Sequence, residues 1–180
     1  MKIYDCFSYW DEDLLLDLRL NVLNNFIDYF VIVEGNKTWQ NNFKKLRFDI
    51  NKFSKFKDKI IYNVVDKDPP DIETIYEEDK DEKDTRGQKL VNNSNKREHF
   101  QREMAQESLK VLAEANPEDI ILISDVDEIP NLNEINFNKI NKKLIFFKQK
   151  MFFYKFNLLH EEINWIGSRA CKKKNLISPQ

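Results

Sequence analysis

Strand-like segments rich in hydrophobic residues recur along the chain, and stretches of helical periodicity separate them. The strand-like segments cover residues 2–7, 29–33, 60–65 and 120–123. The second and fourth are uninterrupted apolar runs, too short for ordinary helices and typical of strands covered on both faces. Strands that alternate with helices predict a single layered α/β domain with a mostly parallel sheet flanked by helices.

Three helices are expected between these segments. The first begins at Asp11 or Asp13 and runs to about Phe26, a second and shorter one covers residues 42–53, and a long one runs from about residue 95 to 115. In the first helix, apolar residues recur at four-residue steps and further leucines widen the buried stripe. The stripe consists of Leu14, Leu18, Val22 and Phe26, widened by Leu15, Leu16, Leu20 and Leu23.

The long helix carries polar residues where its apolar face should continue. Following that face toward the N-terminus leads to Arg97 and Gln101. Burying either side chain without a partner would cost roughly 1–3 kcal/mol. Either the stripe ends in solvent there, or Arg97, Gln101 and the neighbouring Arg102 reach toward an acidic edge of the sheet or a bound phosphate.

Other segments show less periodicity. Residues 71–84 contain eight acids against two lysines, so a mobile acidic loop is expected over about 71–95, either closing over a site or serving as a solvated linker. Residues 144–147 and 151–156 predict a hairpin of aromatic strands whose rings lie mostly in the core. The domain is expected to span residues 1–168, with a basic tail at 169–180.

Composition narrows the function classes. The chain has 180 residues, enough for one compact domain, and a net charge of −2 argues against a dedicated nucleic-acid binder. Cys6 and Cys171 are the two cysteines, so neither a disulfide framework nor a metal–thiolate cluster is expected. The N-terminal residues lack a secretory hydrophobic region, and no apolar run approaches the length of a membrane span. We therefore expect a soluble, cytoplasmic protein.

The segment Ile120–Pro130 combines a buried strand with a cluster of acids. Asp125 and Asp127 follow the strand closely, and two-residue spacing in an extended chain points both carboxylates the same way. Ligands gather at the carboxyl ends of parallel strands. Mn²⁺ or Mg²⁺ takes one or two protein carboxylates and fills its other positions with water and phosphate oxygens, which suits a nucleotide diphosphate. Alternatively, both aspartates are turn or capping residues before Pro130.

These and other segments resemble glycosyltransferase family 17, which includes the bisecting β-1,4-mannosyl-glycoprotein β-1,4-N-acetylglucosaminyltransferase. The resemblance lies in Ile3–Phe7, Asp28–Glu34, Asn36-x-Thr38, Arg97–Arg102 and Asp119–Pro130, with the Gln101-Arg102 pair and the Asp-Val-Asp-Glu-Ile-Pro string as its most specific parts. It implies a GT-A-like nucleotide-sugar fold, an inverting mechanism and a UDP-sugar donor such as UDP-N-acetylglucosamine. It also implies a divalent metal at Asp125 and Asp127.

The resemblance covers most of the first 165 residues. The family pattern continues past Trp165-Ile166-Gly167 into segments that have no counterpart among the 180 residues, so we expect either a minimal version of the family or a truncated polypeptide. A short domain could complete itself by pairing, which makes a homo-oligomer an expectation. Trp165 either stacks on a sugar or fills the core.

The resulting hypothesis is a direct displacement on the donor sugar by a hydroxyl of a glycan or a similar acceptor. The metal at Asp125 and Asp127 would neutralise charge on the leaving diphosphate, and Glu128 would be the catalytic base, with Glu161 or Glu162 as alternatives. Further donor contacts are expected from Glu34, Lys45, Arg97, Gln101 and Arg102. Among these, Glu34 would hydrogen-bond the uridine or ribose, and Arg102 and Lys45 would add positive charge.

Two other function classes fit the same residues. One is a degenerate transferase that binds a sugar or a protein partner without turnover. The other is a metal-dependent phosphatase of the haloacid dehalogenase type, which also places Asp-x-Asp after a strand. In that class the motif normally opens the chain and is followed by Gly-Thr or Val-Thr. In this chain more than a hundred residues precede the motif, and Glu-Ile-Pro follows it directly.

Overall fold

A single mixed sheet organises the computed structural model of the chain, which describes residues 1–80, 85–154 and 158–179. The sheet has six strands in the order β3-β2-β1-β4-β6-β5. The strands are β1 (Ile3–Ser8), β2 (Tyr29–Gly35), β3 (Ile60–Val65), β4 (Ile120–Ile123), β5 (Leu144–Gln149) and β6 (Trp165–Lys172). The α/β class expected from the sequence is confirmed, and so are the four strands expected in the first 123 residues.

The strand pairing changes from parallel to antiparallel across the sheet. β1 pairs in parallel with β2 and with β4, and β2 pairs in parallel with β3. β6 is antiparallel to both of its neighbours, β4 and β5. Because β2 and β4 lie on opposite sides of β1, the chain reverses its direction of travel across the sheet between β1 and β4. Ligand sites in open α/β sheets form at the carboxyl ends of strands where the order reverses in this way.

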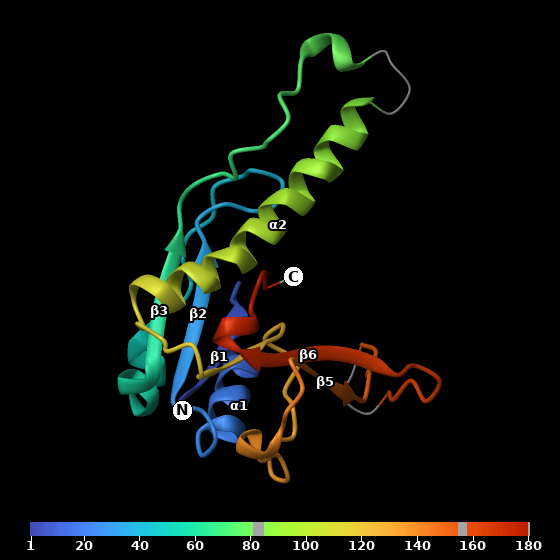
Figure 1. Cartoon of the computed structure of the whole chain (residues 1–180). Helices are drawn as coiled ribbons and strands as arrows, with labels where there is room; N and C mark the ends of the chain where they lie inside the picture. The colour runs from blue at the N-terminus through green and yellow to red at the C-terminus, as the bar shows by residue number, and fades with distance from the viewer. Residues whose placement is uncertain (81–84, 155–157, 180) are drawn as a thin grey trace.

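Helical segments cover both faces of the sheet (Figure 1). The helical segments of the described residues are α1 (Asp13–Leu23), η1 (Ile50–Lys59), η2 (Glu77–Lys80), α2 (Thr85–Val111), η3 (Phe137–Lys139) and η4 (Lys173–Asn175), of which η2 lies beyond the sheet. On one face α2 packs on alternate strand residues, in a cluster of Tyr4, Cys6, Val31, Val33, Val65, Ala105, Leu109 and Ile121. On the other face α1, η1 and η3 enclose a larger cluster that includes Phe7, Leu16, Leu20, Phe30, Ile32, Phe53, Leu122 and Phe137. The two-residue alternation along each strand therefore supplies both cores.

The buried face of α1 is not the one that the four-residue leucine pattern predicts. Leu14 is 76% exposed, and Leu18 and Val22 are nearly half exposed. The buried residues of the helix are Leu16, Arg19, Leu20 and Leu23. The helix is apolar around most of its circumference, and the pattern therefore did not distinguish the face that turns inward, which contains an arginine.

No α-helix forms over residues 42–53, so this prediction is wrong. The chain instead makes an isolated bridge between Lys37 and Phe43 and continues irregularly until η1. The reason is the buried Glu34 carboxylate, which accepts hydrogen bonds from the backbone N–H groups of Arg47 and Phe48 at 2.8 and 3.1 Å. Those donors are then not available to a helical ladder in this segment.

Helix α2 begins at Thr85, ten residues before the expected start, so the acidic loop expected over 71–95 is shorter than predicted. The N-terminal half of α2 extends beyond the sheet, where the preceding segment lies beside it (Figure 1). The side-chain amide of Asn93 accepts a hydrogen bond from the Glu73 backbone N–H and donates one to the Glu73 carbonyl. Lys89 pairs with Asp79 at 2.8 Å. These tertiary contacts stabilise a polar stretch whose sequence shows no apolar stripe. Residues 81–84 lie outside the described part of the chain.

The predicted C-terminal hairpin and tail are both wrong. β5 pairs with β6, with Leu144 opposite Cys171 and Gln149 opposite Trp165, and not with residues 151–156. Residues 169–172, expected in a basic tail, form the end of β6 between β4 and β5. Most of the neighbouring aromatics are exposed rather than in the core, including Phe146, Phe152 and Tyr154, whereas Phe147 is buried. Residues 155–157, part of the predicted second strand, lie outside the described residues.

Among the described residues, none of the helices has the length and apolar character needed to cross a bilayer. The longest, α2, is 27 residues long and carries charged and amide side chains along its length.

The two faces of α1 should respond differently to truncation. We expect Leu20→Ala to lower the free energy of unfolding by about 2–5 kcal/mol, because it removes a fully buried side chain from the core. Leu14→Ala should change it by less than about 0.5 kcal/mol, because that side chain is largely in water. Urea denaturation followed by circular dichroism measures both values, and equal losses would contradict this orientation of α1.

Candidate functional site

A cavity of about 440 Å³ opens at the carboxyl ends of β1 and β4, where the strand order reverses. Its lining comes from the β1–α1 connection, α2 and the loop after β4, together with Trp39. The lining residues are Ser8, Tyr9, Trp10, Glu12, Leu15, Trp39, Glu98, Gln101, Arg102, Asp125, Val126 and Asp127. The acid pair singled out in the sequence thus shares a cavity with Gln101 and Arg102, from a helix more than twenty residues away in the chain.

Arg19 of α1 holds the loop after β4 from inside the protein. Its side chain and that of Asp5 are both 0% exposed, and they pair at 2.6 and 2.8 Å. The guanidinium also donates to Ser124 Oγ, and to the backbone carbonyls of Asp125, Val126 and Glu128 at 3.0–3.2 Å. All five N–H donors of the guanidinium are therefore used, which an ammonium with three donors could not reproduce. This arrangement fixes the backbone on which the acid pair stands.

The three acids of this loop have different surroundings. The Asp125 carboxylate pairs with Arg102 at 2.9 Å. Glu128 accepts from the Asp125 backbone N–H at 2.9 Å with one oxygen and from Trp165 Nε1 at 2.7 Å with the other. Asp127 is exposed at the rim of the cavity, and within the described residues its carboxylate has no hydrogen-bond or ion-pair partner. Asp127 is therefore the acid of this group that is free to bind a ligand.

The carboxylates suit a cation that takes few ligands from the protein. Within residues 1–80, 85–154 and 158–179, no group of three or more His, Cys, Asp or Glu side chains could hold a metal ion. A site made entirely of protein ligands is thus not found there. Asp125 and Asp127 together meet the requirement of Mg²⁺ or Mn²⁺ for one or two carboxylates, with the remaining positions left for water and phosphate oxygens.

Arg97, Gln101 and Arg102 lie on α2 but face different partners. Gln101 is buried and donates to the Val33 carbonyl at 3.1 Å, while Arg97 pairs with Asp68 at 2.7 Å and donates to the Trp39 carbonyl. Burial by itself would raise the pKa of Asp68, but hydrogen bonds from Lys37 and Arg97 lower it. The polar end of the helix stripe is thus fully partnered, and Arg102 is the side chain that reaches the acidic edge.

Glu34 and Lys45 do not line the cavity. Glu34 is fully buried and accepts hydrogen bonds from Lys44 Nζ at 2.5 Å and Tyr62 Oη at 2.8 Å, besides the two backbone N–H groups described above. Burial and then the Glu34 hydrogen bond raise the pKa of Tyr62, which keeps its phenol protonated as a donor. Lys45 is exposed, and its neighbour Lys44 is the lysine that turns inward. In this geometry Glu34 holds the irregular segment that carries Trp39.

Two tryptophans flank the cavity, a feature that the sequence did not single out for donor binding. The rings of Trp10 and Trp39 lie 6.0 Å apart at 59°, and Lys44 Nζ lies 4.8 Å from the centre of the Trp10 ring. Trp39 is 42% exposed, and its carbonyl is held by Arg97. The two indoles come from the ends of neighbouring strands, so their proximity is a consequence of the sheet order.

A second, larger groove lies on the other side of the acid pair. Its volume is about 980 Å³, and Asp125 and Asp127 line it as well as the first cavity. The other lining residues are Leu15, Leu18, Glu128, Ile129, Asn131, Lys148, Gln149, Lys150, Met151, Phe152, Tyr154 and Trp165. Glu161 and Glu162, alternative bases in the sequence hypothesis, do not line it. The acid pair thus stands between two cavities.

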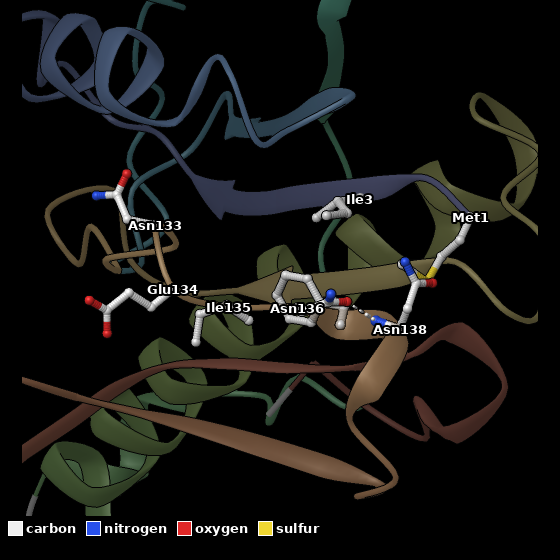
Figure 2. Close-up of a pocket in the computed structure, with 8 residues that line it drawn as sticks. Met1, Ile3, Asn133, Glu134, Ile135, Asn136 and Asn138 are labelled. Atoms are coloured by element: carbon white, nitrogen blue, oxygen red, sulfur yellow. Dashed lines mark hydrogen bonds between the residues drawn. The ribbon is translucent and has the colours of Figure 1, made fainter.

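A further hollow lies at the opposite end of β1, where Met1, Ile3 and residues 133–138 line about 420 Å³ (Figure 2). Glu134 is the one carboxylate side chain in its lining, and the other lining side chains are apolar or amides. The Asn136 side chain is used locally, since its Oδ1 accepts from the Asn138 backbone N–H at 3.1 Å. This hollow offers no arrangement of acids and bases comparable to the one beside β4.

The sequence model of glycosyltransferase family 17 matches residues 1–176 of the 180-residue chain. The chain belongs to glycosyltransferase family 17. Membership indicates a glycosyltransferase, with a sugar donor and an acceptor as its partners. No curated protein and no solved structure matches the chain significantly.

Two features of this family 17 chain were missed in the sequence. Arg19 was not separated from the leucine-rich stripe around it, although an arginine within such a stripe is a signal that a buried acid faces it. Trp10 was not considered because it stands in the short polar segment between β1 and α1. Its position directly after a strand at the acid-bearing edge of the sheet could have identified it.

Breaking the Arg19–Asp5 pair should destabilise this family 17 chain strongly. We expect Arg19→Met to lower the free energy of unfolding by roughly 3–5 kcal/mol, because it leaves the Asp5 charge buried and the three loop carbonyls without a donor. Arg19→Lys should recover only part of the loss, since it restores the charge but not the planar set of donors. Urea denaturation checks both, and a loss below about 1 kcal/mol for Arg19→Met would contradict this role.

Proposed function

We propose that the chain is an inverting, metal-dependent glycosyltransferase with a GT-A-like nucleotide-sugar fold. Its donor would be a UDP-sugar, with UDP-N-acetylglucosamine as the first candidate, and its acceptor a hydroxyl of a glycan or similar molecule. The observation that carries the proposal is the acid pair at the carboxyl end of β4, shared by two cavities at the point where the strand order reverses. One cavity would hold the donor and the other the acceptor.

The diphosphate of the donor would bind at the acid pair through a divalent cation. Asp127 is the carboxylate available for Mn²⁺ or Mg²⁺, and Asp125, which lines the same two cavities, would be the second ligand directly or through water. Arg102 lines the same cavity and would add a positive charge against the phosphates. The metal would act by neutralising the charge that builds on the departing diphosphate.

The uracil would stack on the tryptophan pair. Aromatic side chains beside a phosphate site bind bases through their π-faces with little need for hydrogen bonds. Trp10 and Trp39 flank the cavity that contains Asp127, and Gln101 is part of the lining between them and the acids. Glu34, Lys45 and Arg97 then contribute to donor binding only indirectly, through the segments that they hold or adjoin.

In the transfer step, the acceptor hydroxyl attacks the anomeric carbon of the donor sugar from the groove side. The bond from that carbon to the diphosphate breaks, and its electron pair leaves on the diphosphate. Glu128 would take the hydroxyl proton, because the other two acids lining the groove are assigned to the metal. Each of its oxygens accepts one N–H bond and retains a lone pair for this purpose.

Removing the free carboxylate tests the metal-dependent donor site. We expect Mn²⁺ to strengthen binding of UDP-N-acetylglucosamine by at least about tenfold, and Asp127→Asn to abolish that gain. The unmodified protein should also hydrolyse the donor slowly. Titration calorimetry with and without Mn²⁺ measures the binding, and release of UDP measures hydrolysis.

The matched control for this test is Asp58→Asn, an exposed aspartate of η1 away from both cavities, which should leave both readouts unchanged. Metal-dependent binding without any hydrolysis would favour the non-catalytic module. No effect of Mn²⁺ on binding would refute the metal site.

The aromatic pair gives a second, independent prediction. Trp39→Ala should weaken UDP binding by about 5- to 150-fold, which corresponds to the roughly 1–3 kcal/mol of a base stacked on an aromatic ring. Phe43→Ala is the matched control, because Phe43 lies on the same segment, is 84% exposed and does not line the cavity. Calorimetry with UDP provides the comparison, and equal affinities for the two variants would exclude stacking on Trp39.

A further inference from the structure

The large groove beside the acid pair carries more apolar surface than a sugar hydroxyl requires. Leu18, Phe152 and Trp165 are each more than two-fifths exposed in it, and Tyr154 is 99% exposed. Its volume of about 980 Å³ is more than twice that of the cavity assigned to the donor. Concave sites lined by exposed apolar side chains with a few placed polar groups are typical of sites for small amphiphilic ligands.

Trp165, in the lining of this groove, is held by a hydrogen bond to a side chain of the acid-bearing loop. Its Nε1 donates to Glu128 Oε1 at 2.7 Å, on the same loop as Asp127. The contact lies directly over the backbone of β6 at Gly167, where an added Cβ would collide with the Glu128 carboxylate and with Trp165 Nε1. Only glycine leaves room for this pair. The indole is thus fixed through its edge while 41% of its surface stays exposed.

Beyond Trp165 the groove continues between α1 and the segment after β5. Helix α1 contributes Leu15 and Leu18 to the lining, and the segment after β5 contributes Met151, Phe152 and Tyr154. Lys148 and Lys150 also line the groove and offset part of the negative charge of its three acids. The lining of the groove therefore combines charged side chains with exposed apolar ones.

From this combination of acids, a fixed indole and exposed apolar side chains we propose that the acceptor is a glycoside with an apolar aglycone. Its pyranose stacks on Trp165 beside Asp127 and Glu128, and its aglycone lies along Leu18 and Phe152. The apolar face of a pyranose suits an indole, and the aglycone would cover side chains that otherwise remain in water. The inference rests on the proposed transferase function and adds to it the class of acceptor.

Paired acceptors that differ only in the aglycone test this inference. The probes are octyl and methyl β-glycosides of glucose, galactose and mannose below their micellar concentrations, with UDP-N-acetylglucosamine and Mn²⁺. Each buried methylene contributes about a fourfold gain in affinity, so the preferred octyl glycoside should have a KM at least about tenfold below that of its methyl counterpart. The kcat values should be similar, because the aglycone does not take part in the reaction.

Substitutions in the groove test whether the lower KM of octyl glycosides depends on its lining residues. Leu18→Asn should abolish the octyl advantage, while Val22→Asn, a matched control with nearly the same exposure one turn along α1 and outside the groove lining, should retain it. Trp165→Ala should raise the KM of octyl and methyl glycosides alike without changing donor affinity, and Trp165→Phe should restore part of the loss.

Two results would overturn the inference. One is equal KM values for the octyl and methyl glycosides; the other is failure of every octyl glycoside to accept sugar while donor hydrolysis remains intact. In either case the groove would accommodate something else, such as a protein segment. Absence of both donor binding and donor hydrolysis would instead refute the proposed transferase function, and this inference with it.

Discussion

The buried guanidinium of Arg19 joins three parts of the chain: β1, α1 and the loop after β4. It pairs with Asp5 in β1, stands on α1 and binds three carbonyls and a hydroxyl of the loop after β4. Removing a guanidinium from water is expensive, and a buried ion pair is often no more stabilising than an apolar pair of the same size. We infer that its role is to specify the backbone of the loop, because three of its acceptors are backbone carbonyls of that loop.

This constraint separates the acids near the sheet edge into two kinds. Asp5 and Glu34 are buried, accept two or more hydrogen bonds each and hold the structure around the cavities. Asp127, within the described residues, has no such partner and faces both cavities. A rigid frame of satisfied acids around one unsatisfied acid is the arrangement expected of a site that is preorganised for a cation and a charged substrate. The family 17 membership of the chain agrees with this interpretation.

The irregular segment after β2 shows the same division of roles. The Glu34 carboxylate accepts hydrogen bonds from the backbone N–H groups of Arg47 and Phe48, so these groups are not available to a helix. The segment stays irregular, and its Trp39 lines the cavity. Arg97 then fixes the Trp39 backbone from α2. The side chains expected from the sequence to touch the donor therefore fall into two groups: Arg102 and Gln101 line the cavity, whereas Glu34 and Arg97 hold the segments around it.

The sequence by itself determined the four strands of the first 123 residues, the α/β class and the position of the acid pair, because these depend on local periodicity and on the run of residues at one strand end. Tertiary structure decided the rest. It selected the Arg19 face of α1 over the Leu14 face, and it paired β5 with β6 rather than with residues 151–156. Both choices depend on partners in other segments, Asp5 for the arginine and β4 for β6. An arginine in a leucine-rich stripe indicates that a buried acid faces it, but local patterns do not identify which acid or which strand the partner is.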